Sequence, residues 1–74
     1  MPSRYIVTYK ESTGDSVIDQ HVQQAEAQGH TILHRYHLIR GFEIETKTDN
    51  QFISMLEKDE NVHSIEVQPE GAIQ

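Results

Sequence analysis

Residues 41–45 read Gly41-Phe42-Glu43-Ile44-Glu45, and apolar and acidic side chains alternate strictly along the last four. Successive side chains of a β-strand point to opposite faces, so this pattern predicts a strand with one buried side and one wet side. Phe42 and Ile44 fall on the buried side and the two glutamates on the wet side. One packed and one solvated face is typical of antiparallel sheets. The stretch therefore predicts an antiparallel sheet with one covered face.

A second strand is predicted immediately before this one. Residues 31–37 also alternate, and their side chains divide into two sets, Ile32, His34 and Tyr36 against Leu33 and Arg35. Residues 38–40 are a short link between the two strands. Two strands joined by so short a link form a hairpin.

A helix is predicted before this hairpin, over about residues 15–28. Ser12 and Asp15 have the spacing of a capping box, which would satisfy free backbone N–H groups at the helix start. Gly29 stands where a helix favours a residue with positive φ, and it should end the helix. The apolar stripe of this helix is predicted to comprise Val17, Ile18, His21, Val22 and Ala25.

A second helix is predicted after the hairpin. Thr48 or Asp49 can cap it, and Asn61 is a plausible stop. Its apolar stripe is predicted to comprise Phe52, Ile53, Met55 and Leu56. This helix would cover the same sheet face as the first.

The outermost strands complete the prediction. Residues 4–10 are rich in β-branched and aromatic side chains, and residues 62–67 form a last strand that Pro69 prevents from continuing. The order β-α-β-β-α-β predicts an α+β, ferredoxin-like sandwich, with a four-stranded antiparallel sheet and two helices on one face. The sequence leaves open which face of residues 4–10 meets the helices.

Length and charge limit the classes of function. The 74 residues predict one domain, residues 1–74, without cysteine and with a net charge of −6. This acidic excess argues against a nucleic-acid partner. The sequence has no run approaching ~18 apolar residues and no apolar leader, so we expect a cytoplasmic protein, or an excised segment, without a membrane partner.

No residue pattern predicts a metal or a catalytic site. His34 and His37 lie three apart on a strand and should point to opposite faces, as should the neighbours His63 and Ser64. A solvated helix end, and not a cation site, is predicted for the acidic residues Glu57, Asp59 and Glu60. We therefore expect no cofactor, no metal and no enzyme activity.

The chain resembles the subtilisin propeptide-like protease inhibitor family over nearly its whole length. The resemblance rests on the order and spacing of short motifs, namely Tyr5-Ile6-Val7 with Lys10, Gly29, Ile39-Arg40-Gly41-Phe42 with Ile44, and Ile65-Glu66. It implies an inhibitor of subtilisin-type serine proteases that is monomeric when free and that could also assist folding of the protease. The sheet would dock on two surface helices of the protease.

The resemblance also implies the residues that bind the protease. Glu66 occupies the position of an acidic residue that accepts hydrogen bonds at a helix N-terminus of the protease. Two residues on, where the family often has a second acid, this chain has Gln68. Residues 70–74 form an extended tail that enters the active-site cleft like a product, with the predicted contacts Glu70, Gly71, Ala72, Ile73 and Gln74. Gly71 departs from the apolar residue that such proteases favour fourth from the cut.

Two other functions remain open from the residues alone. A small hydrolase on the same fold would need an anion cradle with an arginine, but Arg4, Arg35 and Arg40 have no glycine-rich phosphate loop beside them. The stronger alternative is a ligand-sensing or self-associating domain that uses its uncovered sheet face. Titration against a subtilisin-type protease distinguishes these functions from inhibition.

Overall fold

The computed structural model describes residues 3–46 and 51–68 of the chain. These residues form six elements in the predicted order. The elements are β1 (Ser3–Tyr9), α1 (Asp15–Ala27), β2 (Thr31–Tyr36), β3 (Gly41–Thr46), α2 (Gln51–Glu57) and β4 (Val62–Gln68).

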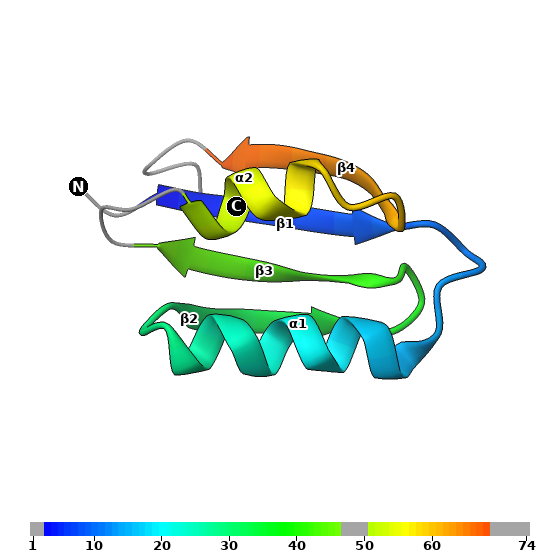
Figure 1. Cartoon of the computed structure of the whole chain (residues 1–74), viewed down its shortest axis with the longest axis horizontal. Coiled ribbons are helices and arrows are strands. Elements are labelled where there is room, and N and C mark those ends of the chain that lie inside the picture. Colours follow the sequence, from blue (N-terminus) through cyan, green and yellow to red (C-terminus); the bar gives the residue numbers. More distant parts are fainter. Residues whose placement is uncertain (1–2, 47–50, 69–74) are drawn as a thin grey trace.

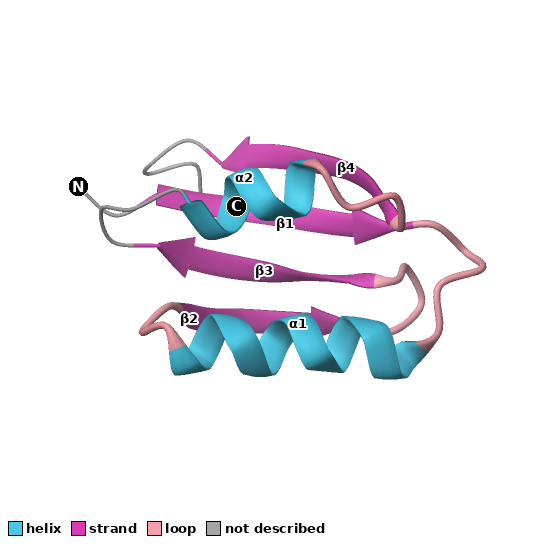
Figure 2. Cartoon of the chain, in the orientation of Figure 1, coloured by secondary structure: helices cyan, strands magenta, loops and turns pink. Residues whose placement is uncertain are grey.

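The four strands form one antiparallel sheet in the order β2-β3-β1-β4. Both helices lie on the same side of this sheet, with α1 along β2 and α2 along β1 and β4 (Figures 1 and 2). The two central strands, β1 and β3, thus come from opposite halves of the chain. This arrangement confirms the predicted ferredoxin-like fold.

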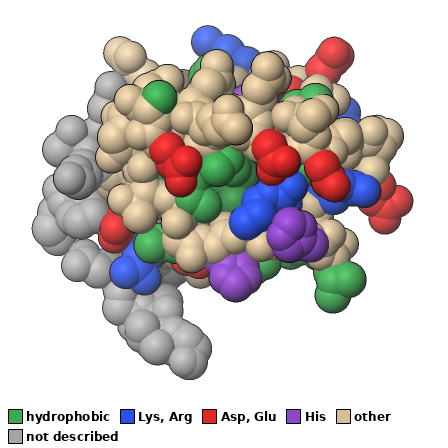
Figure 3. All heavy atoms as spheres, turned by 90° about the horizontal axis from the view of Figure 1, so that it is seen from below, with side chains coloured by type: hydrophobic (Ala, Val, Ile, Leu, Met, Phe, Trp, Pro, Cys, Tyr) green, Lys and Arg blue, Asp and Glu red, His purple; other side chains and the backbone are tan. Residues whose placement is uncertain are grey.

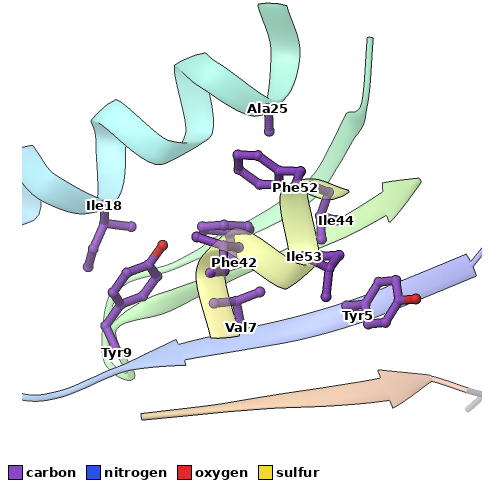
Figure 4. Close-up of a cluster of buried hydrophobic side chains, with 10 residues drawn as sticks. Tyr5, Val7, Tyr9, Ile18, Ala25, Phe42, Ile44, Phe52 and Ile53 are labelled. Carbon is purple, nitrogen blue, oxygen red and sulfur yellow. The ribbon is translucent and has the colours of Figure 1, made fainter. Parts of the chain in front are cut away.

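The core lies between the sheet and the two helices (Figure 4). Alternate residues of β1 and β3 point into it, and the helices contribute the other half. Its buried members are Tyr5, Val7, Tyr9, Ile18, Ala25, Phe42, Ile44, Phe52, Ile53 and Leu56. Because Tyr5, Val7 and Tyr9 are buried, the structure resolves which face of β1 meets the helices.

Two glycines have conformations or surroundings that exclude other residues. Gly29 follows α1 with φ of 91°, a left-handed conformation that side chains disfavour, as the sequence predicted. Gly41 begins β3 so close to β1 that a Cβ atom would overlap the carbonyl oxygen of Val7. Glycine at position 41 therefore lets the two central strands pair.

The predicted cap of the first helix is wrong. Gly14, not Ser12, is the N-cap residue, and no side chain bonds to the free N–H groups there. Asp15 lies instead in the first turn of α1, where a negative charge is favourable. It also pairs with Arg40, so its carboxylate links α1 to the β2–β3 hairpin.

The predicted alternation along the second strand is also wrong. Ile32 pairs with Ile44, but His34 pairs with Glu43, because the register shifts between Ile32 and His34. An extra residue in a β-bulge reverses the side chains that follow it. Ile32 therefore faces the core, whereas His34 and Tyr36 share the opposite face.

The second helix is shorter than the predicted stop at Asn61 implies, since it ends at Glu57. Phe52, Ile53 and Leu56 are buried as predicted, but Met55 is 40% exposed and lies outside the core. The predicted caps, at positions 48 and 49, lie outside the described residues. Within residues 3–46 and 51–68, no helix is long and apolar enough to cross a membrane.

Candidate protein-binding face of the sheet

The sheet face opposite the helices carries a regular set of polar side chains, and we call it the open face. Residues that pair across antiparallel strands point to the same face, so the register defines its members. Arg4, Ile6 and Thr8 alternate with the buried residues of β1 and therefore lie on the open face. Ile6 is half-buried and lies on a central strand of the sheet.

Two glutamates of β3 lie on this face, as the alternation of residues 42–45 predicted. Glu43 pairs with Ile6 and Glu45 pairs with Arg4. Both glutamates are half-buried. The Arg4 Nε atom lies 3.5 Å from the Glu45 Oε2 atom, which makes an ion pair at the edge of the open face. This pair compensates the charge of Glu45.

The two predicted docking residues of the last strand, Glu66 and Gln68, lie side by side on the open face. Glu66 pairs with Ile6, and Gln68 pairs with Arg4. Glu66 is exposed and Gln68 is half-buried. Within the described part of the chain, Glu66 forms no ion pair. Its carboxylate is thus available to an external donor.

The predicted tail contacts lie outside the described residues. They are Glu70, Gly71, Ala72, Ile73 and Gln74. The last described residue, Gln68, is also the last residue of β4. In the sequence, the tail follows the strand that carries Glu66, with Pro69 between them.

At the β2 edge of the open face, two rings lie against each other. The centroids of the His34 and Tyr36 rings are 4.6 Å apart. Beyond this edge, the surface formed by α1 and β2 has basic side chains next to acidic ones (Figure 3). The Arg35 guanidinium lies 3.4 Å from the carboxylate of Asp19 and 3.8 Å from that of Asp15. These ion pairs join α1 to the edge strand.

A polar cluster that the sequence analysis missed lies on the covered side. The Tyr9 hydroxyl is 2.6 Å from Nδ1 of His21, and Nε2 of His21 is 3.5 Å from Oδ2 of Asp59. Burial raises the pKa of Tyr9, and the nearby carboxylate of Asp59 raises it further. Tyr9 is only 3% exposed, so the cluster lies largely inside the fold. The cluster links β1, α1 and the turn before β4.

A shallow recess of about 710 Å³ lies at the end of the sheet away from Gln68. Leu38 at its rim is fully exposed, and Ile39 is half-exposed. The residues that line it are Thr8, Tyr9, Lys10, Glu11, Leu38, Ile39, Arg40 and His63. Residues 3–46 and 51–68 contain no group of three or more His, Cys, Asp or Glu side chains that could hold a metal ion.

The fold and the open face define a class of small α+β protein with an acidic sheet surface that neither described helix covers. Neither the models of known protein families nor the curated proteins give a match to this chain. A function for this chain is therefore inferred from the geometry of the open face and from the motifs in the sequence.

Proposed function

We propose that the chain is a protein inhibitor of subtilisin-type serine proteases. In this proposal the open face docks on two surface helices of the protease, and residues 70–74 occupy the active-site cleft like a product. The observation that carries it is the position of Glu66 and Gln68 together on the open face, at the end of the strand that leads into the tail.

The contact of Glu66 has a simple physical basis. A helix N-terminus presents backbone N–H groups without partners and about half a positive charge, and a carboxylate satisfies both. Glu66 is exposed and has no ion-pair partner within the described residues, so it loses no internal contact when it binds. Such a contact adds affinity without a role in folding.

The tail would act together with the open face. Once the sheet is docked, the tail is held near the cleft at a high effective concentration, so its own contacts need not be strong. Main-chain hydrogen bonds to the protease would hold residues 70–74, and the side chain of Gln74 would fill the primary specificity pocket. The folded domain thus retains a peptide that would otherwise dissociate after cleavage.

The charge of the open face favours a foreign partner over a second copy of the chain. Self-association through this face would bring the carboxylates of Glu43 and Glu66 in one copy toward those of the other, and like charges repel. We therefore propose a free monomer that binds one protease molecule. Under the same proposal the protein is cytoplasmic, is not an enzyme, needs no cofactor and can assist folding of its protease.

A titration of protease activity tests the proposal. Increasing amounts of the chain are added to subtilisin, with trypsin as the control, and residual peptidase activity is measured. We expect inhibition of subtilisin with a 1:1 endpoint and no inhibition of trypsin. Full activity of subtilisin at a large excess of the chain would refute the function. Reversible self-association in sedimentation experiments would then favour the alternative of a self-associating domain.

A further inference from the structure

One of the rows of paired residues that cross the four strands of the open face contains two carboxylates. His34 pairs with Glu43, Glu43 with Ile6, and Ile6 with Glu66. The row therefore has a carboxylate on each side of a half-buried isoleucine. Arg4, a member of the neighbouring row, pairs with Glu45 and not with either of these carboxylates.

Neither carboxylate in the row is compensated by a residue in the described ranges 3–46 and 51–68. Glu43 and Glu66 form no ion pair with any residue that the structure describes. Glu43 is half-buried, so part of its surroundings is protein and its charge is less well solvated than that of a free side chain. Both groups can gain from donors supplied by a partner.

The spacing of the two carboxylates matches the spacing of packed helices. Glu43 and Glu66 lie on the two strands that flank β1, so two inter-strand distances, roughly 10 Å, separate their backbones. The axes of two helices packed side by side lie about 8–10 Å apart. Each carboxylate can therefore face its own helix, with Ile6 against the groove between them.

We propose that Glu43 is a second anchor of the inhibitor, and that Glu43 and Glu66 accept backbone N–H hydrogen bonds from the N-termini of two neighbouring protease helices. This inference rests on the proposed function. It assigns to Glu43 the contact that the family resemblance implies for the acid at position 68, where this chain has a neutral amide. Gln68 then contacts the protease beside Glu66 without a charge.

Inhibition constants of three matched variants test this role. Glu43→Gln and Glu66→Gln each remove one carboxylate at nearly constant shape, and Glu45→Gln is the control because Glu45 lies on the same strand and face but is already paired with Arg4. We expect the first two to weaken inhibition of subtilisin roughly tenfold or more and the control to change it less than about threefold. Thermal unfolding of each free variant separates loss of contact from loss of folding.

Two further variants strengthen the test. Glu43→Asp keeps the charge and should retain part of the affinity that Glu43→Gln loses. The double variant of Glu43→Gln and Glu66→Gln should weaken inhibition by roughly the product of the two single effects, because side chains about 10 Å apart act independently.

The inference and the proposed function fail in different ways. Wild-type inhibition by Glu43→Gln, together with weakened inhibition by Glu66→Gln, would overturn the role of Glu43 and leave the function intact. Tighter inhibition by Gln68→Asp with no effect of Glu43→Gln would assign the second anchor to position 68. An unmodified chain that does not inhibit subtilisin would overturn both.

Discussion

Val7 and Ile6 are neighbours on β1, yet Val7 is fully buried beneath the helices and Ile6 is half-buried on the open face. The same contrast separates Phe42 from Glu43 on β3. Side chains on the covered face therefore stabilise the fold, whereas those on the open face are available to a partner. If this division is correct, substitutions on one face should change stability and substitutions on the other should change inhibition.

The largest effect is expected on the covered face, at Phe42. Its side chain has no exposed surface, and Phe42→Ala should lower the free energy of unfolding by about 3–5 kcal/mol. A core of this size contributes only about 3–5 kcal/mol in net stability, so the variant should be largely unfolded at 25 °C. Circular dichroism during urea titration measures this loss.

Leu38→Ala is the matched control, because Leu38 is fully exposed. Surface substitutions of this kind usually change stability by less than about 0.5 kcal/mol. A Phe42→Ala protein that unfolds at the wild-type urea concentration would contradict the assignment of the core.

The covered face could be predicted only where the pattern along the chain is unambiguous. Phe42-Glu43-Ile44-Glu45 alternates between apolar and charged side chains, so one strand suffices to tell the two faces apart. Residues 5–9 are all aromatic or β-branched, so the odd-numbered and even-numbered side chains could not be told apart by polarity. The error in β2 has a different cause, because the bulge at Leu33 depends on pairing with β3 and not on the strand's own composition.

The open face was predictable in part. Glu66 and Gln68 lie two apart on one strand, so their common face follows from alternation alone. The row that joins Glu43 to Glu66 depends on the register of both strands against β1, and register between distant segments is not encoded locally. His21 looked like part of an apolar stripe, and its contacts with Tyr9 and Asp59 come from three separate elements.

The second prediction removes the tail and leaves both sheet faces intact. Deletion of residues 71–74 should weaken inhibition of subtilisin roughly 100-fold or more, because the linked second contact is lost. The far-UV circular dichroism spectrum should stay nearly unchanged, since the deleted residues belong to none of the six described elements. Inhibition assays with the truncated chain measure the effect. Normal inhibition without these residues would rule out a product-like tail.

The third prediction concerns Gly71, which gives the tail no side chain at that position. The inferred register places Gly71 at an apolar pocket of the protease, and burial of a Val side chain contributes about 1.5–3 kcal/mol. Replacing glycine also restricts the free tail, which lowers the entropy lost on binding. Gly71→Val should therefore tighten inhibition about tenfold.

The control for this variant is Ala72→Val, whose side chain should point away from the pocket in an extended tail. The comparison of inhibition constants is made against one subtilisin. Gly71→Phe should also tighten inhibition, because it too adds an apolar side chain for the pocket. Weaker inhibition by both Gly71 variants would show that the tail binds in another register.

The smallest effect is expected from the Tyr9 hydroxyl on the covered face. Burial and then the carboxylate of Asp59 raise the pKa of Tyr9 above the value of about 10 for tyrosine in the unfolded chain. Above about pH 10 the unfolded chain releases the Tyr9 proton that the folded chain keeps, so the free energy of unfolding falls as the pH rises. Below about pH 10 both states keep the proton, and the contribution of Tyr9 to stability is fully present. At pH 10.5 the loss from this one group is at most about 0.8 kcal/mol.

Urea unfolding of wild type and Tyr9→Phe at pH 8 and pH 10.5 isolates this contribution. Tyr9→Phe leaves Nδ1 of His21 without its partner, which lowers stability at both pH values. The quantity to compare is therefore the change in the free energy of unfolding from pH 8 to pH 10.5 in each protein. Other groups that titrate at alkaline pH are common to both proteins and cancel. Tyr36→Phe, on the open face, keeps Tyr9 and serves as the control for removal of a tyrosine hydroxyl. An equal alkaline loss in Tyr9→Phe and wild type would mean that the Tyr9 hydroxyl is not held in its protonated form by the covered face.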